Sequence, residues 1–137
     1  MTDSINAATP SRPPKSKERQ FKGLSMAERQ QVRREKLIEA GIEAYGSHGF
    51  FSVTVKDICN EAKLTERYFY ESFKKSEHLF QTIFLKLIDE LQQNVMQAMM
   101  QASTDPKKMI EAGLTALLST LRDNPRMARI IYIDAML

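Results

Sequence analysis

Residues 54–73, with the sequence TVKDICNEAKLTERYFYESF, decide the fold. Thr54 can cap a short helix that we expect from Val55 to Ala62, because its hydroxyl can accept a hydrogen bond from a free amide of the first turn. Asp57 stands three residues later and adds a carboxylate where the helix dipole favours one. The stretch therefore begins with a capped helix of about two turns.

A second short helix follows after only two residues, Lys63 and Leu64. Thr65 is the next residue able to cap, and the helix body up to Phe73 is rich in aromatic residues. A turn this short does not let the two helices lie antiparallel, so they must cross at a steep angle. This geometry is typical of a helix-turn-helix, whose second helix enters the major groove of DNA.

The second helix has two different faces. Phe69 and Phe73 are four residues apart and share the inward face, together with apolar residues of the first helix and the turn, namely Val55, Ile58, Cys59 and Leu64. Arg67 and Tyr68 point elsewhere and could reach base edges and phosphates. The alternative is that Arg67 only forms a solvated ion pair with Glu71, one helical turn away.

The segment from Lys36 to Phe80 resembles the DNA-binding domain of the TetR/AcrR family of transcriptional regulators. The resemblance rests on the stretches LIEAGIEAY at 37–45, HGF at 48–50, TVKDI at 54–58 and FYESF at 69–73. It implies an all-α protein in which a three-helix helix-turn-helix domain is followed by a partial helical regulatory domain. It also implies a sequence-specific, ligand-responsive repressor that binds a double-stranded DNA operator as a homodimer.

The resemblance assigns DNA-binding roles to individual residues. Thr54 and Lys56 match positions that approach a phosphate, and Tyr70 matches a phosphate-contacting tyrosine that could also be a half-buried packing ring. With the residues of the second helix and the loop after it, the predicted DNA-binding set is Thr54, Lys56, Thr65, Arg67, Tyr68, Tyr70, Lys74 and Lys75.

Three positions depart from the family pattern. Lys63 stands where a turn glycine is usual, so the turn either avoids a positive φ or accepts a cost of about 1 kcal/mol. Ser72 and Ser76 replace a common histidine and a common lysine. Lys74 and Lys75 precede Ser76, and we expect a phosphate contact in that shifted register.

Charge and composition agree with a DNA-binding head. Residues 1–75 hold 14 Lys and Arg against 10 Asp and Glu, a net of +4, whereas residues 76–137 hold 6 against 7, a net of −1. The hydrophobic fraction of 42% can fill a helical core, and the single cysteine suits a reducing cytoplasm. No apolar run reaches the length of a membrane span, so we expect a cytoplasmic protein.

The first residues differ in character from the rest. Residues 1–22 contain three prolines and no apolar periodicity, which predicts a disordered arm. Its basic residues, Arg12, Lys15, Lys17, Arg19 and Lys22, could follow DNA phosphates or enter a minor groove. The alternative is a solubilising tail. We expect residues 23–76 to form the DNA-binding domain.

Residues 77–137 are expected to form a partial helical domain for ligand binding and dimerisation. Helices are predicted from the Ser25 and Glu28 capping box to about Ser47, from Glu77 to Ala102, and after Asp105-Pro106 and Asn124-Pro125. Gly49 should end the first of these in a left-handed conformation.

The sequence stops on the apolar run IIYIDAML, which predicts a face with nothing to bury against and a truncated regulator. A homodimer is then expected if the full regulatory domain is present. Five methionines could line a pocket for a small hydrophobic effector, although ordinary helix packing is the favoured explanation: Met96, Met99, Met100, Met109 and Met127.

Other kinds of chemistry find little support. His48 and His78 are isolated, Cys59 is expected to be a small core residue, and no cofactor, metal site or enzyme is predicted. The rival interpretation is a helical protein-interaction module whose apolar C-terminal faces dock a partner without specific DNA binding.

Overall fold

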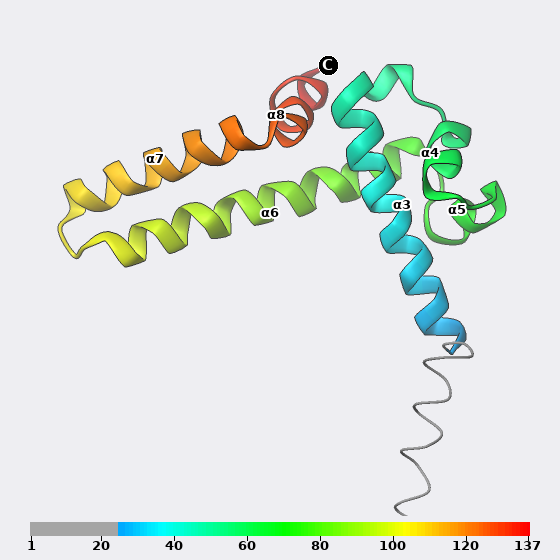
Figure 1. The fold of residues 1–137 in the computed structure, drawn as a ribbon, viewed down its shortest axis with the longest axis horizontal. Coiled ribbons are helices and arrows are strands. Elements are labelled where there is room, and N and C mark those ends of the chain that lie inside the picture. Colours follow the sequence, from blue (N-terminus) through cyan, green and yellow to red (C-terminus); the bar gives the residue numbers. More distant parts are fainter. Residues whose placement is uncertain (1–24) are drawn as a thin grey trace, which may run out of the picture.

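A computed structural model describes residues 25–137, and the predicted arm at 1–22 lies outside the described residues. The described chain is helical, as predicted (Figure 1). Its elements are α3 (Met26–His48), η2 (Phe50–Ser52), α4 (Val55–Ala62), α5 (Glu66–Ser72), α6 (Ser76–Ala102), α7 (Pro106–Asp123), α8 (Pro125–Tyr132) and η3 (Asp134–Met136).

Helices α3, α4 and α5 form a small head. Helices α4 and α5 both pack against α3, and the residues at their junction are fully buried (Figure 1). The core of the head contains Leu37, Ile38 and Tyr45 from α3, Ile58 and Cys59 from α4, and Phe69 and Phe73 at α5. Burial of these apolar side chains holds the short helices, which would be marginal alone.

Helices α6 and α7 form a long hairpin that leaves the head. Figure 1 shows α6 running away from α4 and α5, and α7 returning alongside it. The buried stripe of α6 is Leu79, Ile83, Leu87 and Leu91, spaced by four. Gly113 of α7 allows a close approach, because a Cβ there would lie 2.9 Å from Cγ of Met99.

Helix α8 folds back onto α3, which corrects one expectation. Met127, Ile130 and Ile131 are buried, so the beginning of the last apolar run does find a partner. Arg126 and Arg129 reach the C-terminal end of α3, where the Arg129 guanidinium donates a hydrogen bond of 3.1 Å to the Ser47 carbonyl. The residues that stay exposed are Tyr132, Ile133, Met136 and Leu137.

Of the predicted caps ahead of α3, α7 and α8, two are confirmed and one is wrong. Ser25 and Glu28 form the expected capping box, and Asp105 accepts a hydrogen bond from the amide of Lys107. Asn124 does not cap α8 with its side chain, which instead donates 2.7 Å to the Thr120 carbonyl at the end of α7.

Gly49 ends α3 with a positive φ of 89°, but its ψ of 150° is not the predicted left-handed helical value. The chain therefore leaves α3 extended and enters η2. No helix within residues 25–137 is both long and apolar enough to cross a membrane.

Candidate nucleic-acid interface

The start of α4 carries a complete capping box. The amide of Asp57 donates 3.1 Å to the Thr54 hydroxyl, and the amide of Thr54 donates 2.9 Å to the Asp57 carboxylate. The hydrogen bond that the Thr54 amide donates to the Asp57 carboxylate, with a smaller contribution from the Thr54 side chain, holds the pKa of Asp57 below its usual range. The amides of Val55 and Lys56 have no acceptor among the described residues. They are suited to a phosphate oxygen, because the helix dipole also favours an anion there.

The turn between α4 and α5 contains a residue with a positive φ, which is one of the two possibilities that the sequence left open. Lys63 adopts the left-handed conformation, with φ of 60° and ψ of 43°, where the sequence offers no glycine. Its amide and that of Leu64 bond back to the carbonyls of Asn60 and Cys59, at 3.2 and 2.9 Å. Two of the last carbonyls of α4 are thus satisfied, and the chain changes direction within two residues.

Thr65 does not cap α5 with its side chain, which corrects the sequence prediction. Its carbonyl accepts a hydrogen bond of 3.0 Å from the amide of Tyr68, but its hydroxyl receives none from the helix. The residue is exposed. The Thr65 hydroxyl is therefore available for an external partner at the start of α5.

The inward face of α5 is built as predicted. Phe69 and Phe73 are fully buried, and their ring centroids lie 5.7 Å apart. Cys59 of α4 is buried in the same core, and burial raises the pKa of its thiol. A buried thiol with a raised pKa is a packing residue and a poor nucleophile. These contacts fix which side of α5 faces outward.

Tyr70 and Arg67 lie on the outward side of α5. Tyr70 is 54% exposed, and its ring packs edge-to-face on Phe69 at 5.1 Å. Arg67 is exposed and forms no ion pair among the described residues. The alternative pairing of Arg67 with Glu71 is wrong, because Glu71 binds Arg33 of α3 instead, with Arg33 Nη2 2.9 Å from the carboxylate.

Tyr68 is less exposed than the sequence indicated. It is half-buried, and two guanidinium groups approach its ring: Arg33 at 4.2 Å and Arg67 at 5.6 Å from the centroid. Sequence analysis missed Arg33, since it stands 38 residues from Glu71 and no local spacing links them. The only signal was its position ahead of the buried part of α3.

Lys74 and Lys75 lie in the exposed loop between α5 and α6. The Lys74 amide donates 3.2 Å to Nδ1 of His78, and Lys75 precedes α6 as a cap residue without a side-chain bond. No hydrogen bond or ion pair within the described chain engages either ammonium group. The structure brings Arg67 and Tyr68 into contact, whereas Thr54, Lys56 and the two lysines stand apart from them in the same segment.

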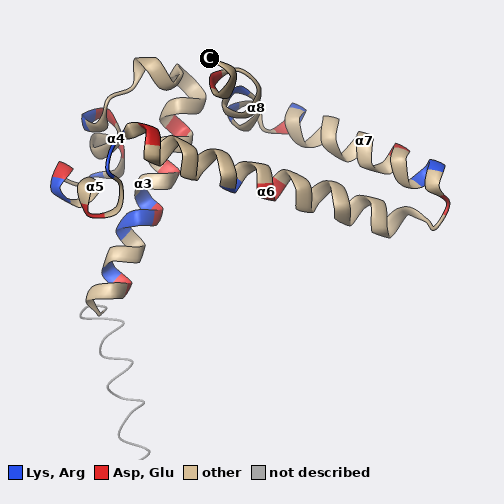
Figure 2. Cartoon of the chain, turned by 180° about the vertical axis from the view of Figure 1, so that it is seen from behind, with Lys and Arg blue, Asp and Glu red and all other residues tan. Residues whose placement is uncertain are grey.

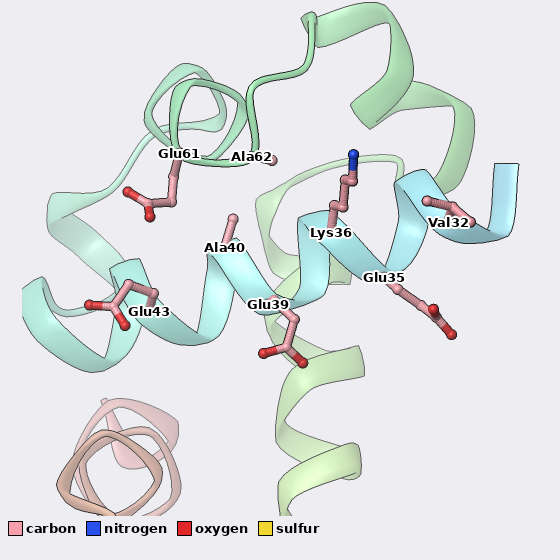
Figure 3. A pocket seen from close by; sticks show the side chains of 8 residues that line it. All are labelled: Val32, Glu35, Lys36, Glu39, Ala40, Glu43, Glu61 and Ala62. Atoms are coloured by element: carbon pink, nitrogen blue, oxygen red, sulfur yellow. The ribbon is translucent and has the colours of Figure 1, made fainter. Parts of the chain in front are cut away.

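A groove between α3 and α4 has the opposite charge. Figure 3 shows the carboxylates of Glu35, Glu39 and Glu43 on α3 and of Glu61 on α4, with Lys36 alone as a cation. Such a groove repels phosphates. Figure 2 shows the basic positions of the head on the first half of α3, at the start of α4, on α5 and in the loop that follows α5. Duplex DNA is therefore favoured on the α5 side.

Metal chemistry finds no site in the part of the chain that the structure describes. Residues 25–137 contain no group of three or more His, Cys, Asp or Glu side chains that could hold an ion. The two histidines, His48 and His78, lie in different helices.

Comparison with known proteins gives a family match, matches to solved structures and one negative result. Residues 37–83 match the family model of bacterial regulatory proteins, tetR family. A solved structure of a TetR family transcription regulator from Marinobacter aquaeolei VT8 superposes with a TM-score of 0.68 at 20% sequence identity, which shows a shared fold. The match covers 77% of this chain and 55% of that one, so the chain spans about half its length. A comparison with curated proteins found no match.

Proposed function

We propose, because the chain carries the N-terminal domain of the TetR family of transcriptional regulators, that it binds an operator in double-stranded DNA and represses transcription. Helix α5 enters the major groove, where Arg67 and Tyr68 contact bases. Thr54, Lys56, Tyr70, Lys74 and Lys75 contact phosphates, and Thr65 lies at the entry of α5 into the groove.

The observation that carries this proposal is the two-sided build of α5. Its inward face is locked by two buried phenylalanine rings, while Arg67 on its outward face has no carboxylate partner within residues 25–137. A guanidinium that has no carboxylate partner and stands on a rigid helix can donate two parallel hydrogen bonds to a guanine edge. A solvated surface arginine would more commonly find an acid within one turn, and here the acid is taken by Arg33.

Homodimerisation is part of the proposal. Three apolar side chains of α7, Ile110, Leu114 and Leu118, are exposed and spaced by four, so they share one face. A helical face of this kind supports association between two copies, directly or through further helices. Two heads can then read half-sites about one helical turn of DNA apart.

A ligand response would act through the α6 and α7 hairpin. Met96 and Met100 are exposed and Met99 and Met109 are half-buried near its tip, where adaptable thioether side chains suit a small hydrophobic effector. An effector that prefers a different spacing of the two heads would weaken operator binding. We place this regulator in the cytoplasm, where the operator is.

Selection from random duplexes tests the proposal. The full chain is bound to a pool of duplexes with a randomised centre, and the enriched sequence is titrated against a scrambled duplex of equal length at several salt concentrations. We expect one sequence to be enriched, and affinity to fall with salt with a slope that reflects the phosphates contacted. Removal of residues 1–20 should reduce that slope if the basic arm follows the backbone.

The second candidate function is a helical protein-interaction module, and the exposed apolar face of α7 favours it. Such a module would associate with its partner without DNA and with little dependence on salt. Failure to enrich any duplex, together with salt-independent self-association, would replace the regulator proposal by this one.

A further inference from the structure

We propose that Arg33 of α3 is a positioning residue that sets how α5 presents Tyr68 and Arg67 to DNA, and so contributes to sequence selectivity. This inference rests on the proposed DNA-binding function. Arg33 itself lies on another helix, 38 residues from Glu71 in the sequence. It acts through two residues of α5.

The first link is a two-pronged ion pair with Glu71. Nε of Arg33 donates 3.0 Å to one carboxylate oxygen, and Nη2 donates 2.9 Å to the other. The side chains are only 20% and 30% exposed, so solvent competes weakly for the pair. A guanidinium fork meets a carboxylate in one plane, and this geometry fixes the rotation of α5 about its axis more firmly than a single bond would.

The second link is a stacking contact with Tyr68. The Arg33 guanidinium carbon lies 4.2 Å from the ring centroid, while Arg67 lies 5.6 Å from the same centroid. Tyr68 is thus held by a cation from α3 beside the arginine that we place in the groove. A side chain already ordered before binding loses less entropy when it meets a base.

The third link concerns charge. Glu71 places a carboxylate on the helix proposed to meet DNA, where it would repel phosphates. Arg33 neutralises this carboxylate, and it also keeps Glu71 from pairing with Arg67 one turn earlier. The structure therefore leaves Arg67 without a carboxylate partner within residues 25–137.

The test compares two duplexes, the selected one and its scrambled form, and measures the ratio of the two affinities. The variants are Arg33→Gln, Arg33→Lys, Glu71→Gln and the double variant Arg33→Gln/Glu71→Gln. Lys36→Gln is the matched control, since it removes one positive charge from an exposed position of the same helix. Thermal unfolding is recorded for each protein, and Arg33→Lys serves where Arg33→Gln does not fold.

We expect every Arg33 and Glu71 variant to lower the affinity ratio by about tenfold, on the scale of one lost base contact. Affinity for the scrambled duplex should fall in Arg33→Gln and rise in Glu71→Gln, because their charge changes are opposite. The double variant should lose no more selectivity than either single one, since both break the same pair. Lys36→Gln should leave the ratio unchanged.

Three outcomes would count against the proposals, with different meanings. A wild-type chain that does not distinguish the duplexes overturns the proposed function. A wild-type chain that does distinguish them, with Arg33→Lys and Glu71→Gln variants that retain its full ratio, overturns the role of Arg33 alone. Equal losses on both duplexes would assign Arg33 to electrostatic attraction or folding and would likewise overturn the positioning role.

Discussion

Gly41 of α3 and Ile83 of α6 meet where the head joins the hairpin. A Cβ added at Gly41 would lie 2.5 Å from Cδ1 of Ile83 and 3.2 Å from Cδ2 of Leu79. Both partners are fully buried, so they have little room to move. The absence of a side chain at Gly41 therefore sets how closely α6 crosses α3, and with it the position of the head on the body.

Gly41→Ala should destabilise the fold by about 1–3 kcal/mol, because the new methyl overpacks a closed core. Ile83→Val removes the clashing Cδ1 and should cost about 0.5–1.5 kcal/mol by itself. Denaturant unfolding of both single variants and the double variant gives the coupling. The double variant should lose less than the two single losses together, whereas strict additivity would mean that the two residues do not compete for space.

Lys63→Gly should stabilise the protein by about 0.5–1 kcal/mol, because glycine adopts the left-handed conformation without strain. Part of this gain is lost, because glycine also increases the conformational entropy of the unfolded chain. Lys63→Ala is the control, because alanine removes the charge and keeps the Cβ. Urea midpoints distinguish the two. A gain for alanine as large as that for glycine would attribute the effect to charge and not to the positive φ of 60°.

Arg67→Ala should weaken binding to the selected duplex by about 1–3 kcal/mol and broaden the base preference at one position. The reason is its exposed place on α5 without an acidic partner. A gel-shift titration against single-base variants of the selected duplex measures both effects. Unchanged affinity and preference would remove Arg67 from the base-reading set.

Tyr70→Phe should weaken selected and scrambled duplexes to the same extent, because the hydroxyl is proposed to bind a phosphate and the phosphate is common to both. The ring packing on Phe69 is retained in this variant. Affinities measured in parallel at one salt concentration check the prediction. A loss confined to the selected duplex would instead place Tyr70 against a base.

We expect the wild-type protein to lose folding stability between pH 10 and pH 12, and we expect Tyr45→Phe to abolish this loss. Burial raises the pKa of Tyr45 to about 12 from its ordinary value of 10.0, so the unfolded chain releases this proton first as the pH rises. Folding stability is then full below pH 10 and falls by up to about 3 kcal/mol through pH 12. Its hydroxyl makes no well-formed hydrogen bond within residues 25–137, and Ser76 offers only a weak one, so the variant should lose little at neutral pH.

Denaturant unfolding as a function of pH gives the comparison, since lysine titration is common to both proteins and cancels. Parallel curves for wild type and variant between pH 10 and pH 12 would show that Tyr45 ionises equally well in the folded state.

Local signals in the sequence predicted the helices and the inward face of α5. Capping residues, the two-residue turn and the spacing of Phe69 and Phe73 act over a few residues, and the structure confirms the helix boundaries they imply to within one or two residues. Thr65 and Asn124 show the limit of this reasoning. Both residue types can cap, but the choice depends on a rotamer that the tertiary surroundings decide.

Contacts between distant segments could not be predicted in the same way. Helix packing pairs Glu71 with Arg33, which stands 38 residues earlier in the sequence. It also brings Arg126 of α8 to Ser47 at the end of α3, across 79 residues. The sequence offered a nearer partner for Glu71 at Arg67. Arg67 and Tyr68 were inferred from the outward face of the second helix, and Thr54, Lys56 and Tyr70 through the resemblance to a family. Their contacts with DNA stay predictions.

Hydrogen exchange of the full chain with and without its selected duplex tests most directly whether α4 and α5 hold the DNA-binding face. We predict that the duplex slows amide exchange in residues 54–75 and leaves the α6 and α7 hairpin at its free rate near the tip. Protection confined to the hairpin, or to the acidic groove between α3 and α4, would contradict the account.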